Sequence, residues 1–94
     1  MGRLMYTPDS SYDIDDRILA HLRVVMMNKL RRGEGFMLQL PTAGGGRSSI
    51  WVRPKMAPLI QLYGGRAPQL DRDLIKEMMS KASDYDGLTL SSRT

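Results

Sequence analysis

The sequence contains no cysteine, only one histidine and no long apolar run. Without cysteine the chain can form neither a disulfide nor a thiolate metal site, and it has no thiol nucleophile. A membrane-spanning helix needs about 20 apolar residues in succession, and no segment approaches that length. The first residues also lack the pattern of a secretory signal peptide. We therefore expect a cytoplasmic protein without a cofactor, whose fold is stabilised by packing alone.

Aromatic residues are scarce at 6%, but the hydrophobic share of 41% and the charged share of 26% are ordinary for a globular domain. A chain of 94 residues can form one modest core. The sequence shows no internal repeat and no linker that would divide it. It predicts a single α+β domain over residues 1–94.

Alternating apolar and polar residues between turn signals indicate six strands. The predicted strands are 3–6, 11–14, 36–40, 47–53, 59–63 and 88–90. The first two flank Thr7-Pro8-Asp9-Ser10, which is typical of a turn, and the three middle strands are expected to form a meander. Pro54 and Pro58 separate the last two strands of that meander.

Two helices complete the prediction. Asp15 or Asp16 caps the first helix, and Gly33 closes it. Asp71 caps the second, which we expect to run to about Tyr85. The resulting order is β-β-α-β-β-β-α-β, with a small mixed or antiparallel sheet and two helices.

The first predicted helix has two apolar strips. The wider strip faces the core and consists of Ile18, Leu19, Leu22, Val25, Met26 and Leu30. The narrower strip, Ala20, Val24 and Met27, packs either against a loop or an edge strand or against a second copy of the chain. His21 lies with Arg17 on a polar stripe, and we interpret it as a surface residue.

Positive charge is concentrated in the middle of the chain. Residues 17–66 contain nine basic side chains and a single acid, Glu34, although the net charge of the whole chain is only +4. This distribution favours an anionic partner, but the acidic ends of the chain could equally pair with the basic middle.

Two segments resemble ligand sites. Gly44-Gly45-Gly46-Arg47-Ser48-Ser49 lacks the spacing of a phosphate-binding Walker loop and leads into a strand, so we interpret it as a hairpin tip. Trp51 and Arg53 share one face of a strand, and with Tyr63 they could form a platform for nucleic-acid bases. We favour the alternative in which Trp51 is half-buried and packs under a helix, with Arg53 at the rim.

Several motifs, taken in order, resemble a family of small actinobacterial and actinophage proteins of unknown function. They are Met1-Gly2-Arg3-Leu4, Asp15-Asp16-Arg17, Ala20-His21-Leu22, Lys29-Leu30-Arg31-Arg32-Gly33-Glu34, Gly46-Arg47-Ser48-Ser49-Ile50-Trp51-Val52, Gly65-Arg66-Ala67-Pro68 and Gly87-Leu88. Proteins of that family often carry the label of ATP-dependent DNA ligase. A ligase adenylates the lysine of a Lys-x-Asp-Gly motif, whereas here Lys81 is too far from Asp86-Gly87. We expect no ligase activity.

The sequence also lacks a recognisable general acid/base pair, a metal-ligand cluster and an activated nucleophile. The leading hypothesis is a non-enzymatic basic module that binds DNA or RNA through the phosphate backbone. The residues assigned to this role are Arg17, Arg31, Arg32, Arg47, Arg53 and Lys55. The alternative is a homodimeric interaction protein that acts on a host or phage protein. Its interface would include Ala20, Val24, Met27 and Trp51.

Overall fold

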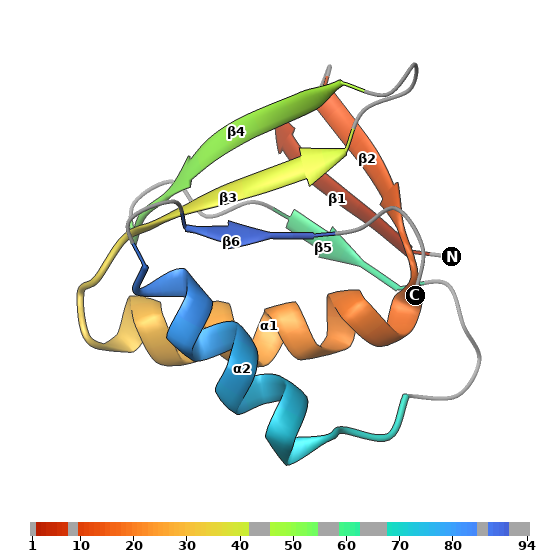
Figure 1. Ribbon diagram of the computed structural model, residues 1–94. Coiled ribbons are helices and arrows are strands. Elements are labelled where there is room, and N and C mark those ends of the chain that lie inside the picture. Colours follow the sequence, from red (N-terminus) through yellow and green to blue (C-terminus); the bar gives the residue numbers. More distant parts are fainter. Residues whose placement is uncertain are drawn as a thin grey trace.

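The computed structural model describes residues 2–7, 10–41, 46–54, 59–62, 68–84 and 87–90, and its elements follow the predicted order (Figure 1). Strands β1 (Gly2–Thr7) and β2 (Ser10–Ile14) precede helix α1 (Asp16–Arg31). Strands β3 (Phe36–Pro41), β4 (Arg47–Val52) and β5 (Leu59–Gln61) precede helix α2 (Arg72–Ala82) and the short strand β6 (Leu88–Thr89). The predicted α+β class is confirmed.

Local sequence signals set both ends of α1. The Asp15 carboxylate accepts a hydrogen bond from the Arg17 backbone N–H at 3.0 Å, which makes Asp15 the N-cap. At the other end, Gly33 has a φ of 72°, and the Glu34 N–H donates to the Lys29 carbonyl at 3.0 Å. This is the Schellman arrangement, in which glycine adopts the left-handed conformation at low cost.

Helix α2 begins as predicted but ends earlier. The Asp71 carboxylate caps it by accepting from the N–H groups of Asp73 and Leu74, at 2.9 and 3.3 Å. The expected end near Tyr85 is wrong, because Ala82 is the last helical residue and Ser83 is the C-cap. The chain has to turn there in order to place β6 beside β3, where Leu88 is aligned with Leu38.

The strands form two three-stranded sheets, one in the order β2-β1-β5 and the other in the order β4-β3-β6. The predicted meander is therefore wrong in its third strand, because β5 pairs antiparallel with β1 and not with β4. Pro54 lies two residues after the end of β4, and proline has no N–H to extend a hairpin ladder. The pairing with β1 places Ile60 opposite Leu4, where Ile60 packs against the core.

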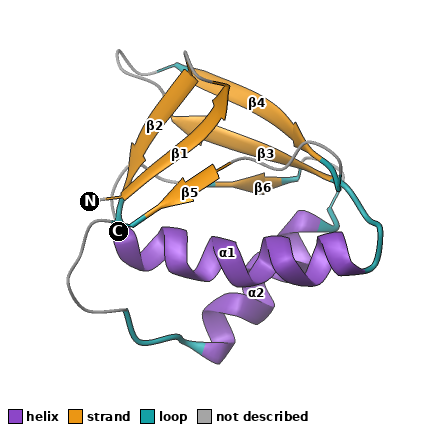
Figure 2. Cartoon of the chain, turned by 180° about the vertical axis from the view of Figure 1, so that it is seen from behind, coloured by secondary structure: helices purple, strands orange, loops and turns teal. Residues whose placement is uncertain are grey.

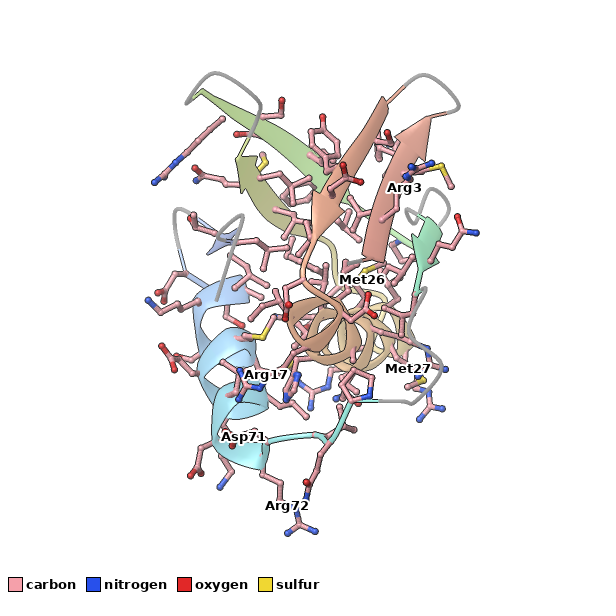
Figure 3. All side chains as sticks on the ribbon, turned by 90° about the vertical axis from the view of Figure 1, so that its right-hand side faces the viewer. Arg3, Arg17, Met26, Met27, Asp71 and Arg72 are labelled. Atoms are coloured by element: carbon pink, nitrogen blue, oxygen red, sulfur yellow. The ribbon has the colours of Figure 1, made fainter. Side chains whose placement is uncertain are left out.

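The two sheets lean together above α1 (Figures 1 and 2). Helix α2 lies beside α1, on the side of the β4-β3-β6 sheet, as the view along α1 in Figure 3 shows. The core fills the space between the two sheets and the helices. It comprises Leu4, Ile14, Leu19, Leu22, Val25, Met26, Phe36, Leu38, Leu40, Ile50, Val52, Met78, Ala82, Leu88 and Leu90.

Candidate nucleic-acid interface

The outward side of β4 carries an aromatic side chain between two arginines. Ile50 and Val52 are buried, whereas Arg47 and Trp51, which alternate with them, are exposed, and Arg53 continues the exposed side just beyond the strand. With 50% of its surface exposed, Trp51 is half-buried as the favoured interpretation expects, and its indole packs on the backbone at Gly35. Both helices lie below the two sheets (Figure 2). We call Arg47, Trp51 and Arg53 the outer face of β4.

The indole of Trp51 lies against the backbone at Gly35. A Cβ atom at position 35 would lie 3.1 Å from the indole Cζ2 and 2.8 Å from the carbonyl oxygen of Val52. Both distances are shorter than comfortable contacts, so only glycine lets the chain pass this close to the ring. Gly35 thus contributes to the position of Trp51.

The basic residues predicted to bind phosphate do not form one patch. Arg31 is the last residue of α1 and Arg32 is its C-cap. Strand β3 starts a few residues later and pairs Phe36 with Val52, so the end of α1 and the end of β4, which Arg53 follows, lie at the same end of the molecule (Figure 1). All three arginines are exposed. We call Arg31, Arg32 and Arg53 the basic end of the molecule.

The other predicted phosphate ligands lie elsewhere. Arg47 is at the opposite end of β4, about 20 Å from Arg53 at the usual rise of a strand. Arg17 is in the first turn of α1, about 21 Å along the helix axis from Arg31. Lys55 lies outside the described residues, as does Tyr63.

Arg17 faces the second helix instead of the basic end. Its guanidinium lies 3.5 Å from the Asp71 carboxylate, and both side chains are about half exposed. Figure 3 shows the two residues side by side at the start of α2. A hollow of about 640 Å³ lies there, but the cation and the N-cap carboxylate that line it are engaged with each other. We therefore assign Arg17 to the attachment of α2 and not to the binding of a ligand.

His21 is completely buried, so its interpretation as a surface residue is wrong. Its Nε2 accepts a hydrogen bond from the Asp71 backbone N–H at 2.8 Å, and its Nδ1 lies 2.5 Å from the Arg17 carbonyl oxygen. A carbonyl only accepts, so the network assigns the proton to Nδ1 of a neutral imidazole. Both ring nitrogens are occupied, and His21 joins α1 to the start of α2.

A pocket of about 470 Å³ opens beside Trp51, where α1, β3, β4 and the end of α2 meet. Its lining residues are Lys29, Glu34, Gly35, Phe36, Met37, Trp51, Ala82, Ser83 and Asp84. The Lys29 ammonium donates to Ser83 Oγ at 2.7 Å and to Glu34 Oε1 at 3.2 Å, and only 8% of the Lys29 side chain is exposed. Sequence reasoning missed this pocket because the end of α2 is 54 residues from Lys29.

The strip proposed as a dimer contact is largely covered by the chain itself. Ala20 is only 8% exposed and Val24 is half-buried, whereas Met27 is 36% exposed. In Figure 3, Met26 points toward the sheets and Met27 points away from them. Packing within the chain therefore accounts for most of the strip.

No group of three or more histidine, aspartate or glutamate side chains is placed to hold a metal ion among the residues described. Neither α1 nor α2, as far as the structure describes them, is long and apolar enough to cross a bilayer.

Comparison with known proteins identifies one family. The sequence profile described as "Domain of unknown function (DUF7882)" matches residues 1–93. No curated protein and no solved structure matches the chain significantly. The match spans both sheets and both helices, so the outer face of β4 and the pocket lie within the part of the chain that the family profile covers.

Proposed function

We propose that the chain, which belongs to the DUF7882 family of domains of unknown function, is a non-enzymatic module that binds single-stranded nucleic acid. The observation that supports this proposal is the half-exposed indole of Trp51 between Arg47 and Arg53 on the outer face of β4. Every base has a flat π-face, and stacking on an aromatic side chain contributes about 1–3 kcal/mol per base. Arginines on the same face supply the contacts to phosphate.

A single strand fits this geometry better than a duplex. The bases of a duplex are stacked inside the helix, whereas those of a single strand can turn out and lie on an aromatic ring. Arg47 and Arg53, about 20 Å apart along the strand direction, would contact phosphates on either side of the stacked base.

The basic end extends the charged surface beyond the strand. Four exposed arginines, Arg31, Arg32, Arg47 and Arg53, then contribute positive charge to this surface. Each neutralised phosphate of a single strand contributes about −0.7 to the slope of log affinity against log salt, so four give about −2.8. Binding should weaken roughly fiftyfold between about 50 and 200 mM salt.

The test is fluorescence anisotropy with labelled single-stranded and duplex oligonucleotides, each at several salt concentrations. Trp51→Ala should weaken single-strand binding by about ten- to a hundredfold, since it removes the stacking contribution. The double variant Arg31→Glu, Arg32→Glu should weaken binding and roughly halve the salt slope. A matched control is Arg72→Glu, Lys76→Glu on α2, because both residues are exposed and the change in charge is the same.

Unchanged affinity in both Trp51→Ala and the arginine double variant would reject the proposal. Tighter binding of duplex than of single strands would reject the stacking arrangement. No binding of any oligonucleotide at the lowest salt would favour a protein partner instead.

We also propose that the protein originates from an actinobacterium or an actinophage. The support for this origin is the resemblance of the sequence motifs to proteins of those organisms.

A further inference from the structure

The pocket beside Trp51 has the size and lining of a site for a small planar ligand. Its volume of about 470 Å³ lies within the usual range for small-molecule sites, about 300–1,000 Å³. One wall is the indole of Trp51, and Glu34, Ser83 and Asp84 add polar groups. A base that stacks on the indole would therefore have hydrogen-bonding groups within reach of its edge.

Lys29 and Glu34 form a hydrogen-bonded ion pair in this pocket. The Lys29 ammonium has three N–H donors, of which Ser83 Oγ and Glu34 Oε1 accept two. The side chain of Glu34 is 49% exposed, and its Oε2 accepts no hydrogen bond within the described part of the chain. Because Lys29 fixes one oxygen of the carboxylate, the other is held in position for a donor on a ligand.

The charges around the pocket are arranged in two zones. Glu34 and Asp84 line the pocket itself. Arg31 and Arg32 come just before Glu34 in the chain, and Arg53 comes just after Trp51, so the basic end adjoins the pocket. The positive charge of the basic end disfavours a ligand that is itself a cation, such as the side chain of a lysine or arginine from another protein. A nucleotide suits both zones, since its phosphates meet arginine while its base meets the carboxylates.

From these observations we propose that the pocket beside Trp51 binds the Watson–Crick edge of guanine. This inference rests on the proposed function, because it identifies which base occupies the site on the outer face of β4. Guanine presents two adjacent donors on that edge, N1–H and the N2 amino group, and a carboxylate can accept both. Its O6 atom is an acceptor that the third N–H of Lys29 can reach. Stacking on Trp51 holds the ring in place.

The other bases match this pocket less well. Adenine and cytosine each present a single amino donor next to an acceptor nitrogen, and that acceptor would face the carboxylate. Thymine and uracil present one N–H between two carbonyl groups. A good bidentate pair between a side chain and a base discriminates by about tenfold or more against the wrong base. We therefore expect guanine to bind about tenfold more tightly than any other base.

The experiment uses the full chain and its own fluorescence, because Trp51 is the only tryptophan. The probes are an all-thymine DNA oligonucleotide and the same oligonucleotide with one central guanine, adenine, cytosine or hypoxanthine. Quenching of Trp51 should show about tenfold tighter binding of the guanine oligonucleotide. Hypoxanthine lacks the N2 amino group and should lose most of that preference.

Two variants test the carboxylates separately. Glu34→Gln and Asp84→Asn each keep the size of the side chain and remove its charge. At least one should reduce the ratio between the affinities for the guanine and the all-thymine oligonucleotides. Circular dichroism shows that each variant is folded, and Thr89→Ala on β6 is a control at an exposed position outside the pocket lining.

The outcomes separate this inference from the proposed function. Equal binding of all five oligonucleotides would overturn the guanine inference and leave single-strand binding intact. A preference for guanine that persists in both carboxylate variants would overturn the assignment to this pocket. Absence of quenching and of binding with every oligonucleotide would overturn both proposals together.

Discussion

Replacement of His21 offers the sharpest test of how the two helices are held together. The imidazole is fully buried and joins the Arg17 carbonyl on α1 to the Asp71 N–H at the start of α2. His21→Leu keeps most of the volume but removes both hydrogen bonds. Each of these hydrogen bonds contributes about 0.5–1.5 kcal/mol to stability, so the loss of both should cost about 1–3 kcal/mol.

His21→Ala removes the ring as well and leaves a cavity. The combined loss of packing and hydrogen bonds should cost about 3–5 kcal/mol. A domain of this size has a total stability of roughly 5–14 kcal/mol, so the alanine variant should be visibly destabilised. Each kcal/mol corresponds to about 4–8 °C in the melting temperature. We therefore expect His21→Leu to melt about 10 °C below the unaltered chain and His21→Ala lower still.

The assay is urea unfolding followed by circular dichroism, which gives the free energy of unfolding directly. Asn28→Ala is the matched control, since Asn28 belongs to the same polar stripe of α1 and should change the stability by less than about 0.5 kcal/mol. If His21→Leu is as stable as the unaltered chain to within that margin, the hydrogen bonds to Arg17 and Asp71 do not contribute to stability, and our account of the buried histidine is wrong.

Two glycine substitutions make further tests. Gly33→Ala should cost about 1 kcal/mol in urea unfolding, because φ at this position is 72° and a Cβ meets no atom within 4 Å; a cost near zero would contradict the conformational argument. Gly35→Ala should displace the indole, since the new Cβ crowds both Trp51 and the Val52 carbonyl, and should shift the emission of Trp51 and weaken oligonucleotide binding. An unchanged emission spectrum together with full affinity would show that Gly35 does not position Trp51.

The parts of the fold that were predicted correctly depend on local signals. Asp15, Asp71 and Gly33 each cap a helix that is adjacent to them in sequence, so the residues that decide the boundary are all within a few positions. The order of strands and helices follows from the same kind of signal. The end of α2 was placed too late because contacts between β6 and β3, about 50 residues apart, decide it.

The parts that were missed depend on contacts between distant segments. The pairing of β5 with β1 joins Ile60 to Leu4, and no pattern within either strand specifies that partner. Burial of His21 depends on its hydrogen bond with the backbone N–H of Asp71, which is 50 residues away in the sequence. A polar stripe on a helix indicates solvent only where no other element covers it, and here the N-terminus of α2 supplies the hydrogen bonds that make burial favourable.

The candidate site shows the same division. Alternation along β4 correctly placed Trp51 and Arg53 on one face, because strand periodicity is local. The sequence could not show that Arg17 lies far from Arg31, or that Lys29 and Ser83 meet across the two helices. Charge composition alone therefore left open whether the basic residues share one face, whereas the structure divides the arginines among two ends of the molecule and the start of α2.

Helix α2 is attached to α1 by polar contacts at both of its ends, and this arrangement separates stability from binding. At its start, Asp71 is held by His21 and Arg17; at its end, Ser83 is held by Lys29. Only the second contact adjoins the pocket beside Trp51. Loosening the start of α2 should therefore leave the pocket in place, provided that the chain remains folded. We expect His21→Leu to lose stability yet bind the guanine oligonucleotide with nearly unchanged affinity at low temperature, where the folded state predominates. A parallel loss of affinity in that variant would mean that the two ends of α2 are coupled, and the pocket would then depend on the position of the whole helix.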